Sequence, residues 1–246
     1  RMAMLRVPLA RFGDGRALAE TGDYRVLPVL PTGNRQNRFI GDWLVYGNAT
    51  WGEEQQRNTR TNALRYADDA APVELAPGHG IERIEAMGSD AVLIGNLGNE
   101  LRFTSLALRG QNASLRDGWR MADARQGESR THGFFYRRDG VEEGIVGLPV
   151  LRDRGEGQGA AVTYLRNKAL IWQPLGELAS EATRRDDGCI ASCVDWYGDA
   201  RPIFIGQRVF ALMGYELVEG RIGAAGIRER RRIDFSPATA AVIGRD

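Results

Sequence analysis

His132 is the residue whose neighbours are best suited to chemistry. It follows Glu128, Ser129 and Arg130 and stands just before an apolar run at 133–136. A histidine beside a carboxylate and an arginine can act as a general base or bind an anion. A nucleophilic triad would need a third group, and no Gly-x-Ser-x-Gly elbow occurs in the chain. His132, Glu128 and Arg130 are therefore candidate catalytic residues, with anchoring of the strand that follows as the structural alternative.

Asp195, Trp196 and Tyr197 form a second candidate site, for binding. Aromatic side chains with a polar end suit wet interfaces, and the neighbouring carboxylate adds a hydrogen-bond acceptor. These residues would then line a rim that binds sugar or peptide. The alternative is that Trp196 packs in a core between turn aspartates, in an arrangement similar to the Trp-Asp pair of repeated β-units.

Cys189 and Cys193 are the only cysteines, four positions apart in a turn-like Gly-Cys-Ile-Ala-Ser-Cys segment. A metal site would need two further ligands, and neither of the two histidines is close in sequence. We therefore expect no metal site. From the residues alone, a disulfide, buried free thiols and redox chemistry all stay open.

The elements that must position these residues are strands. Short apolar or alternating runs bounded by Gly, Asn, Asp or Pro dominate, and a sustained helical period is missing. The clearest runs lie at 39–46, 91–94, 101–106, 133–136, 145–150, 161–165, 202–205, 209–212 and 215–218. Hairpin turns are expected at 96–99 and 167–168, because Gly and Asn tolerate positive φ. The sequence predicts an all-β fold with tight turns.

The strands recur in a similar pattern. A glycine and a polar residue precede an apolar run, then a turn and a second strand, starting near positions 41, 88, 160 and 206. Most intervals are close to the about 40–50 residues of one propeller blade. The longer gap holds residues 111–130, which we interpret as an ordered polar insertion. Residues 1–246 are predicted to form a single β-propeller domain of about five to six four-stranded units, with a sandwich or closed barrel as the alternative.

A Gly-His pair at 78–79 leads into three successive strands, and this WD-like layout favours the propeller. In WD-type repeats, a histidine at this position makes a structural hydrogen bond between neighbouring strands. We therefore expect His79 to be structural.

Composition limits the kinds of partner. The chain has 33 lysine and arginine residues and 32 acidic residues, so its net charge is too small to attract nucleic acid electrostatically. Lys168 is the only lysine, which we attribute to genome bias. No run approaches the about 20 apolar residues that cross a bilayer, and phosphate-loop, dinucleotide and basic-aromatic motifs are absent. We expect no cofactor, no nucleic-acid partner and no membrane-spanning segment.

Four segments carry a family resemblance: RFIGDWLVYG at 38–47, RIEAMGSDAV at 83–92, QGESRTHGFFY at 126–136 and DDGCIASCVDWYG at 186–198. Through them, most of the chain resembles a bacterial family of exported proteins with a C-terminal β-propeller distantly related to WD40 repeats. The resemblance implies a propeller fold and a periplasmic, cell-surface or extracellular location. It carries over no catalytic residue and implies no reaction.

An exported location bears on the cysteines and on the start of the chain. In an oxidising compartment an even pair at short range predicts a disulfide between Cys189 and Cys193, which would fix the entry into 194–197. Export also requires a signal peptide, and none follows Arg1. We therefore expect the chain to be the C-terminal part of a full ring, with the signal peptide and early blades upstream in the parent protein.

Repeated units, balanced charge and the lack of a convergent catalytic motif favour a non-enzymatic binding or scaffold propeller of the bacterial cell envelope or secreted fraction. Its expected partner is a protein or carbohydrate, or the missing N-terminal part of the same parent protein. The second hypothesis is a hydrolase or lyase with an active site in the propeller channel near His132, because catalytic groups on separate blades leave no local motif.

Overall fold

The computed structural model describes residues 2–13, 15, 18–153, 158–181 and 200–235. Strands dominate this part of the chain, and its single α-helix, α1 (Glu53–Arg57), has five residues. The prediction of an all-β fold is therefore confirmed. Within the same residues, no helix is long and apolar enough to cross a membrane.

The strands form five antiparallel sheets that follow one another along the chain. A two-stranded sheet contains β1 (Met2–Leu5) and β2 (Tyr24–Leu27), with the short 3-10 helices η1 (Leu9–Arg11) and η2 (Thr21–Asp23) between them. The first large sheet contains β3 (Asn34–Ile40), β4 (Trp43–Ala49), β5 (Thr61–Arg65) and β6 (Val73–Leu75). The second contains β7 (Arg83–Met87), β8 (Asp90–Leu97), β9 (Glu100–Arg109) and β10 (Asn112–Met121). The third contains β11 (Ala124–Gln126), β12 (Phe135–Arg138), β13 (Glu143–Asp153), β14 (Gln158–Lys168) and β15 (Ile171–Ala179), and the 3-10 helix η3 (Thr131–Gly133) lies between β11 and β12. The fourth contains β16 (Arg201–Ile205), β17 (Arg208–Met213), β18 (Glu216–Gly223) and β19 (Gly226–Asp234).

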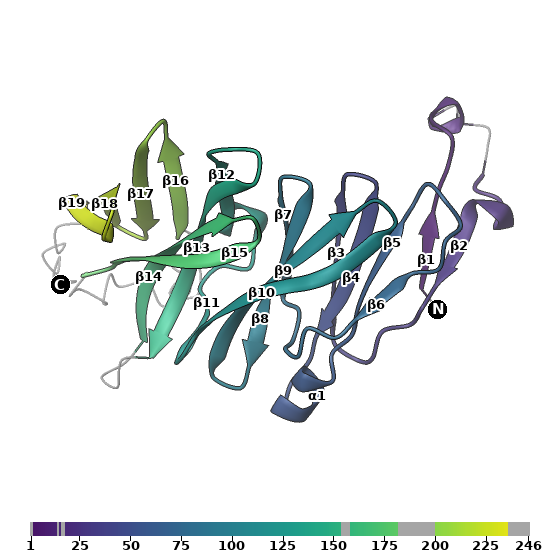
Figure 1. Cartoon of the computed structure of the whole chain (residues 1–246), viewed down its shortest axis with the longest axis horizontal. Helices are drawn as coiled ribbons and strands as arrows, with labels where there is room; N and C mark the ends of the chain where they lie inside the picture. Colours follow the sequence, from purple (N-terminus) through teal and green to yellow (C-terminus); the bar gives the residue numbers. More distant parts are fainter. Residues whose placement is uncertain (1, 14, 16–17, 154–157, 182–199, 236–246) are drawn as a thin grey trace, which may run out of the picture.

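The first, second and fourth large sheets are meanders whose strands pair in the order of the chain. The third sheet departs from this rule, since β11 and β12 both pair with β13, at opposite ends of that long strand. The sheets follow one another in a row from the N-terminus on the right to the C-terminus on the left (Figure 1). Strands in equivalent positions of neighbouring sheets contact each other, as β3 contacts β7 and β10 contacts β15.

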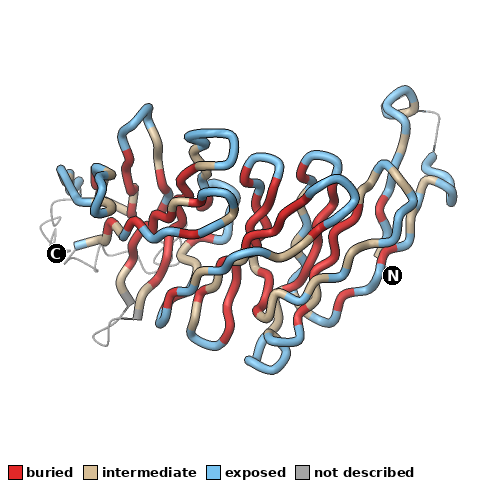
Figure 2. Tube along the Cα trace, in the orientation of Figure 1, coloured by how far each residue is buried: buried red, intermediate tan, exposed pale blue. Residues whose placement is uncertain are grey.

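The apolar core lies between successive sheets, where the buried segments of the chain gather (Figure 2). Strand β8 shows why, because all of its residues are buried. Its Val92 and Ile94 belong to the cluster shared with the third sheet, whereas Ala91 and Leu93 belong to the cluster shared with the first. A strand covered on both faces needs apolar residues at consecutive positions, and this explains the uninterrupted run that the sequence shows there.

The repeat pattern corresponds to one particular turn of each sheet. Gly41, Gly88 and Gly206 each begin the hairpin turn between the first two strands of a sheet, with φ of 53°, 70° and 57°. Positive φ at these positions favours glycine. The repeat near position 160 coincides with the start of β14, and the longer gap before it contains the additional elements η3 and β12.

Residues 111–130 are not the polar insertion that we expected, because they contain strands β10 and β11. Strand β10 is polar because it is the outermost strand of the second sheet, and only Ala113 and Met121 in it are buried. Solvent exposure at a sheet edge therefore explains the composition that resembled an insertion.

One expected turn is confirmed and one is displaced. Strand β8 ends at Leu97 and β9 begins at Glu100, with Gly98 at φ 56° between them, as predicted. The turn expected at 167–168 lies instead at Ala169 and Leu170, with φ of 49° and 67°. Residues other than glycine, asparagine and aspartate rarely adopt positive φ, so the sequence pattern does not indicate a turn there.

Stacked antiparallel meanders are the units from which propellers are built. The described residues contain four such sheets and one two-stranded sheet. The two-stranded sheet and the fourth sheet lie at opposite ends of the row (Figure 1). The structure therefore shows the stacked sheets, and closure of the row into a ring stays a prediction.

Gly95 in β8 allows a close approach between two backbone segments. An ideal Cβ at this position would lie 2.0 Å from the carbonyl oxygen of Gly80. Because the backbone would have to move apart, we expect Gly95→Ala to lower the free energy of unfolding by about 1–3 kcal/mol, measured by urea denaturation. Gly80→Ala is the matched control, since its Cβ would meet nothing closer than 3.4 Å. Equal losses in the two variants would contradict this account.

Candidate functional site

Arg83 in β7 is a buried cation, with 4% of its side chain exposed. Its Nε donates to Gln126 Oε1 at 2.7 Å, and its Nη1 donates to Glu85 Oε1 at 2.9 Å. Its Nη2 donates to the backbone carbonyl oxygens of Glu128 at 2.7 Å and Arg130 at 2.9 Å. Arg83 thus connects the first strand of the second sheet to the segment that opens the third.

Carboxylates from neighbouring strands complete a network around Arg83. Glu85 also forms an ion pair with Arg38 of β3, and Gln126 Nε2 donates to Glu82 Oε2 at 3.0 Å. Burial lowers the pKa of Arg83 to about 10, so the guanidinium stays charged at neutral pH. Burial also raises the pKa of Glu82, against the effect of the hydrogen bond from Gln126. Strands β3, β7 and β11 therefore share one charged network.

Glu128, Arg130 and His132 lie together at the edge of this network. The side chain of Glu128 is 3% exposed, and its Oε2 lies 3.3 Å from Nε2 of His132, whose side chain is 36% exposed. Glu128 Oε1 accepts a hydrogen bond from the backbone N–H of Arg130 at 2.6 Å. The short helix η3 carries His132. The structure thus brings the side chains of Glu128 and His132 together, whereas Arg130 takes part through its backbone.

This arrangement suits two roles. An imidazole beside a carboxylate is a candidate general base. The same contacts also anchor the strand that follows, because Arg83 holds the carbonyl groups of Glu128 and Arg130 in place. The loop is closely packed as well, since a Cβ on Gly133 would lie 2.6 Å from Glu128 Cγ. Anchoring accounts for the hydrogen bonds to the backbone of Glu128 and Arg130, whereas the contact between His132 and Glu128 suits either role.

His79 is fully buried and links two segments of the second sheet. Its Nδ1 lies 2.8 Å from the carbonyl oxygen of Gly80 and donates to it. Its Nε2 lies 2.9 Å from Thr104 Oγ1 in β9 and accepts the hydroxyl proton. Both ring nitrogens of a neutral imidazole are therefore satisfied, in the structural role expected for this residue.

The burial of His79 predicts a pH dependence of stability. Burial lowers its pKa from 6.5 to about 4, so the unfolded state takes up a proton first as the pH falls. The contribution of neutral, buried His79 to the free energy of unfolding is complete above about pH 6.5. About 3 kcal/mol of it is lost by about pH 4. Urea denaturation across this range measures the loss. The variant His79→Gln should show a smaller slope than the wild type, and identical slopes would contradict the assignment.

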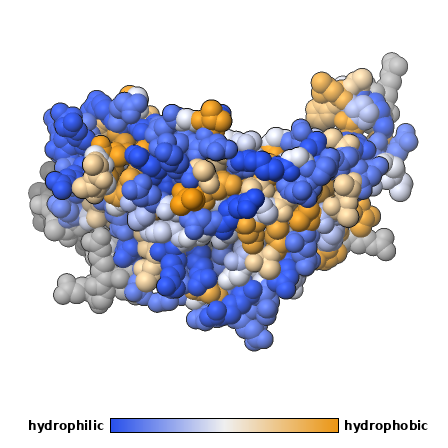
Figure 3. Space-filling view, in the orientation of Figure 1, coloured by the Kyte–Doolittle hydropathy of each residue, from blue (hydrophilic) through white to orange (hydrophobic). Residues whose placement is uncertain are grey.

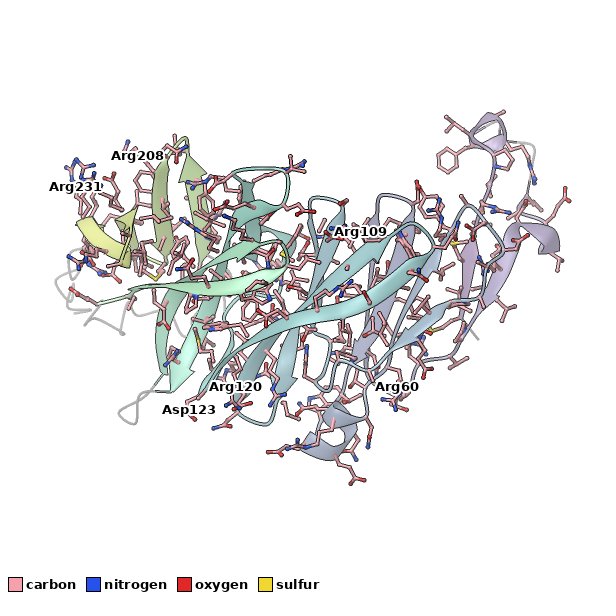
Figure 4. All side chains as sticks on the ribbon, viewed as in Figure 1. Arg60, Arg109, Arg120, Asp123, Arg208 and Arg231 are labelled. Atoms are coloured by element: carbon pink, nitrogen blue, oxygen red, sulfur yellow. The ribbon has the colours of Figure 1, made fainter. Side chains whose placement is uncertain are left out.

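Two hollows lie at opposite edges of the row of sheets. One has a volume of about 340 Å³ and is lined by residues that include Asp90, Arg109, Arg138 and Glu142. The other has a volume of about 590 Å³ and is lined by residues that include Trp51, Glu82, Asp123 and Arg125. In Figure 4, Asp123 marks the lower edge, which carries the second hollow, and Arg109 lies nearer the upper edge.

The residues of the two hollows form no sequence motif that indicates a site. They come from turns of successive sheets that are far apart in the sequence, so no local motif joins them. Trp51 is the one lining residue for which the sequence offers a local signal, because a tryptophan beside Gly52 in a polar stretch indicates a loop. Its side chain stands in solvent, with 73% of the residue exposed.

Several predicted site residues lie outside the described part of the chain. These are Cys189, Cys193, Asp195, Trp196 and Tyr197. Among the described residues, no group of three or more histidine, cysteine, aspartate or glutamate side chains is placed to hold a metal ion.

The fold defines the chain as an all-β protein of stacked antiparallel sheets. No protein-family model and no curated protein matches the sequence.

Proposed function

We propose that this protein is a non-enzymatic binding or scaffold propeller of the bacterial cell envelope or secreted fraction. The observation that supports binding most directly is the hollow of about 590 Å³ at the lower edge of the row. It gathers residues from the loop after β4, the β8–β9 turn, the β10–β11 turn and the end of β13. Loops positioned by a rigid scaffold are where binding sites concentrate.

In this proposal the four large sheets are blades, and further chain of the parent protein completes the ring. The two-stranded sheet supports completion, because its outer face carries Leu5, Tyr24 and Val26, which are 49%, 48% and 71% exposed. Further apolar residues gather on the segment between β1 and β2 that contains η1 (upper right in Figure 3). A strand pair that is apolar on both faces is typical of a sheet covered on both sides.

A binding protein should retain a partner without transforming it. The test immobilises the protein and measures retention of bacterial envelope proteins and of purified cell-wall polysaccharides. A panel of glycosides and esters is assayed in parallel for turnover. Retention without turnover is the expected result, and turnover without any retained partner would overturn the proposal.

The second candidate function is a hydrolase or lyase at His132. It is favoured by one observation, the 3.3 Å separation between His132 Nε2 and the buried carboxylate of Glu128. Turnover of any member of the panel that His132→Gln abolishes would support it. The variant should leave the far-ultraviolet circular dichroism unchanged, because the imidazole is partly exposed.

Export predicts that Cys189 and Cys193 are oxidised to a disulfide in the protein isolated from the envelope. Alkylation before and after reduction, followed by mass spectrometry, measures this directly. We expect labelling only after reduction. Two alkylated thiols without reduction would speak against both the disulfide and the exported location.

A further inference from the structure

Trp51 lies between two neighbouring hollows and lines both of them. On one side is the hollow of about 590 Å³, and on the other is a hollow of about 390 Å³ formed by the segment before β3, the loop after β4, and α1 with the loop that follows it. We call the two together the Trp51 groove. The polar residues considered as ligand contacts are Thr32, Thr50 and Asn58 on one side of Trp51, and Glu82, Asn99 and Arg125 on the other.

The indole of Trp51 offers a flat apolar surface to solvent. The residue is 73% exposed, whereas Trp172 of the core is 7% exposed. A large aromatic side chain is normally buried, because transfer of its surface from water stabilises the folded state. Its position in a polar loop between two hollows therefore indicates a ligand that covers the ring.

Neutral hydrogen-bonding groups surround the indole. Thr32 and Asn58 are exposed on one side, and Asn99 lines the hollow on the other. Hydroxyl and amide groups both donate and accept hydrogen bonds. They match the hydroxyl groups of a sugar, which also donate and accept.

Three carboxylates, from Glu54, Glu82 and Asp123, and two arginines, Arg125 and Arg152, are the charged groups that line the groove. Glu82 is half-buried and its raised pKa reflects loss of water around the carboxylate, which is suited to accept hydrogen bonds from hydroxyl groups. Arg125 is exposed, and its side chain has no ion pair or hydrogen bond with the part of the chain that the structure describes. Arg152 is already paired with Glu177 at 2.9 Å. An anionic polymer would need an excess of cations, which the groove lacks.

From these observations we propose that the Trp51 groove binds a neutral oligosaccharide. A pyranose ring stacks its apolar face on Trp51, and its neighbours extend into the two hollows. Glu82 and the amide and hydroxyl groups accept and donate hydrogen bonds to the sugar hydroxyls, and Arg125 donates at the rim. This inference rests on the proposed binding function and names the chemistry of its ligand.

The experiment uses hexasaccharides of β-1,4-glucan, β-1,3-glucan, α-1,4-glucan and N-acetylglucosamine as probes. Binding to the full chain is measured by saturation-transfer NMR and by calorimetry. We expect at least one probe to bind and Trp51→Ala to weaken that binding at least tenfold. Trp51→Phe should retain part of the affinity, because the smaller ring still stacks. Val141→Ala is the matched control, since Val141 is 85% exposed in the hollow at the opposite edge.

Two outcomes would overturn the proposal. Either no probe binds at millimolar concentration, or a probe binds with the same affinity to Trp51→Ala. A screened peptide library whose binding depends on Trp51, with no sugar bound, would assign the groove to a peptide instead. Retention of an envelope protein by the Trp51→Ala variant would leave the general binding function intact, so the two proposals fail separately.

Discussion

Replacing Arg83 with alanine is expected to lower the free energy of unfolding by about 3–5 kcal/mol. The variant removes one buried cation and leaves Oε1 of Glu85 and two backbone carbonyl groups without their donor. Buried polar groups that lose a charged partner cost far more than an exposed ion pair contributes. Urea denaturation followed by far-ultraviolet circular dichroism measures the change.

Arg35→Ala is the control for this prediction. Arg35 lies in β3 and is exposed, so its removal should change the free energy of unfolding by about 0.5 kcal/mol or less. Arg83→Lys adds a second test, because lysine keeps the positive charge but cannot donate the four hydrogen bonds that the guanidinium of Arg83 makes. It should recover only part of the loss. If Arg83→Ala were as stable as Arg35→Ala, the network would not connect the sheets as described.

Phe103→Ala is expected to cost about 3–5 kcal/mol of unfolding free energy. Phe103 in β9 is fully buried in the cluster between the second and third sheets. Its ring meets Trp119 at 5.3 Å and Trp172 at 5.9 Å between centroids, both edge to face. Truncation removes these contacts and leaves a cavity, because the strands on either side are held in their sheets and cannot move in to fill it. Thermal and urea unfolding both report the loss.

The matched control for Phe103 is Phe39→Ala, since Phe39 is 57% exposed. Its loss should be well below that of Phe103 because less apolar surface returns to water. Near-ultraviolet circular dichroism gives an independent check, because the signal of Trp119 and Trp172 should change in Phe103→Ala only. A small loss of stability with an unchanged aromatic signal would contradict the packing of this junction.

The sequence predicts the local features of the fold well. Runs of apolar residues and glycines such as Gly41, Gly88 and Gly206 mark strands and turns, because each depends on a few adjacent residues. The displaced turn at Ala169 and Leu170 shows the limit, since there the sheet imposes a backbone conformation that the side chains do not favour. Strand β10 was missed because exposure at an edge makes a strand look like a loop.

The candidate site was harder to predict because its contacts join distant segments. Arg83 and Gln126 are far apart in the sequence, yet their side chains form a hydrogen bond of 2.7 Å. The chain is rich in arginine, and no sequence pattern distinguishes Arg83, which is buried, from the exposed arginines. Glu128 and His132 were found because they are four residues apart on one loop. Trp51 was missed because an exposed tryptophan is recognised only once its surroundings are known.

Lys168, the only lysine, gives this protein a single side-chain amine through which it could be coupled to a surface in one orientation. Lys168 ends β14, opposite Glu143 of β13, and its side chain is 74% exposed. Arg152, at the other end of β13, lines the Trp51 groove roughly 30 Å away along the strand. Coupling through the lysine amine would therefore tether the edge opposite the groove and leave the groove facing the solution. Arginine does not react with amine-directed reagents, so this orientation would be the same for every molecule coupled through a side chain.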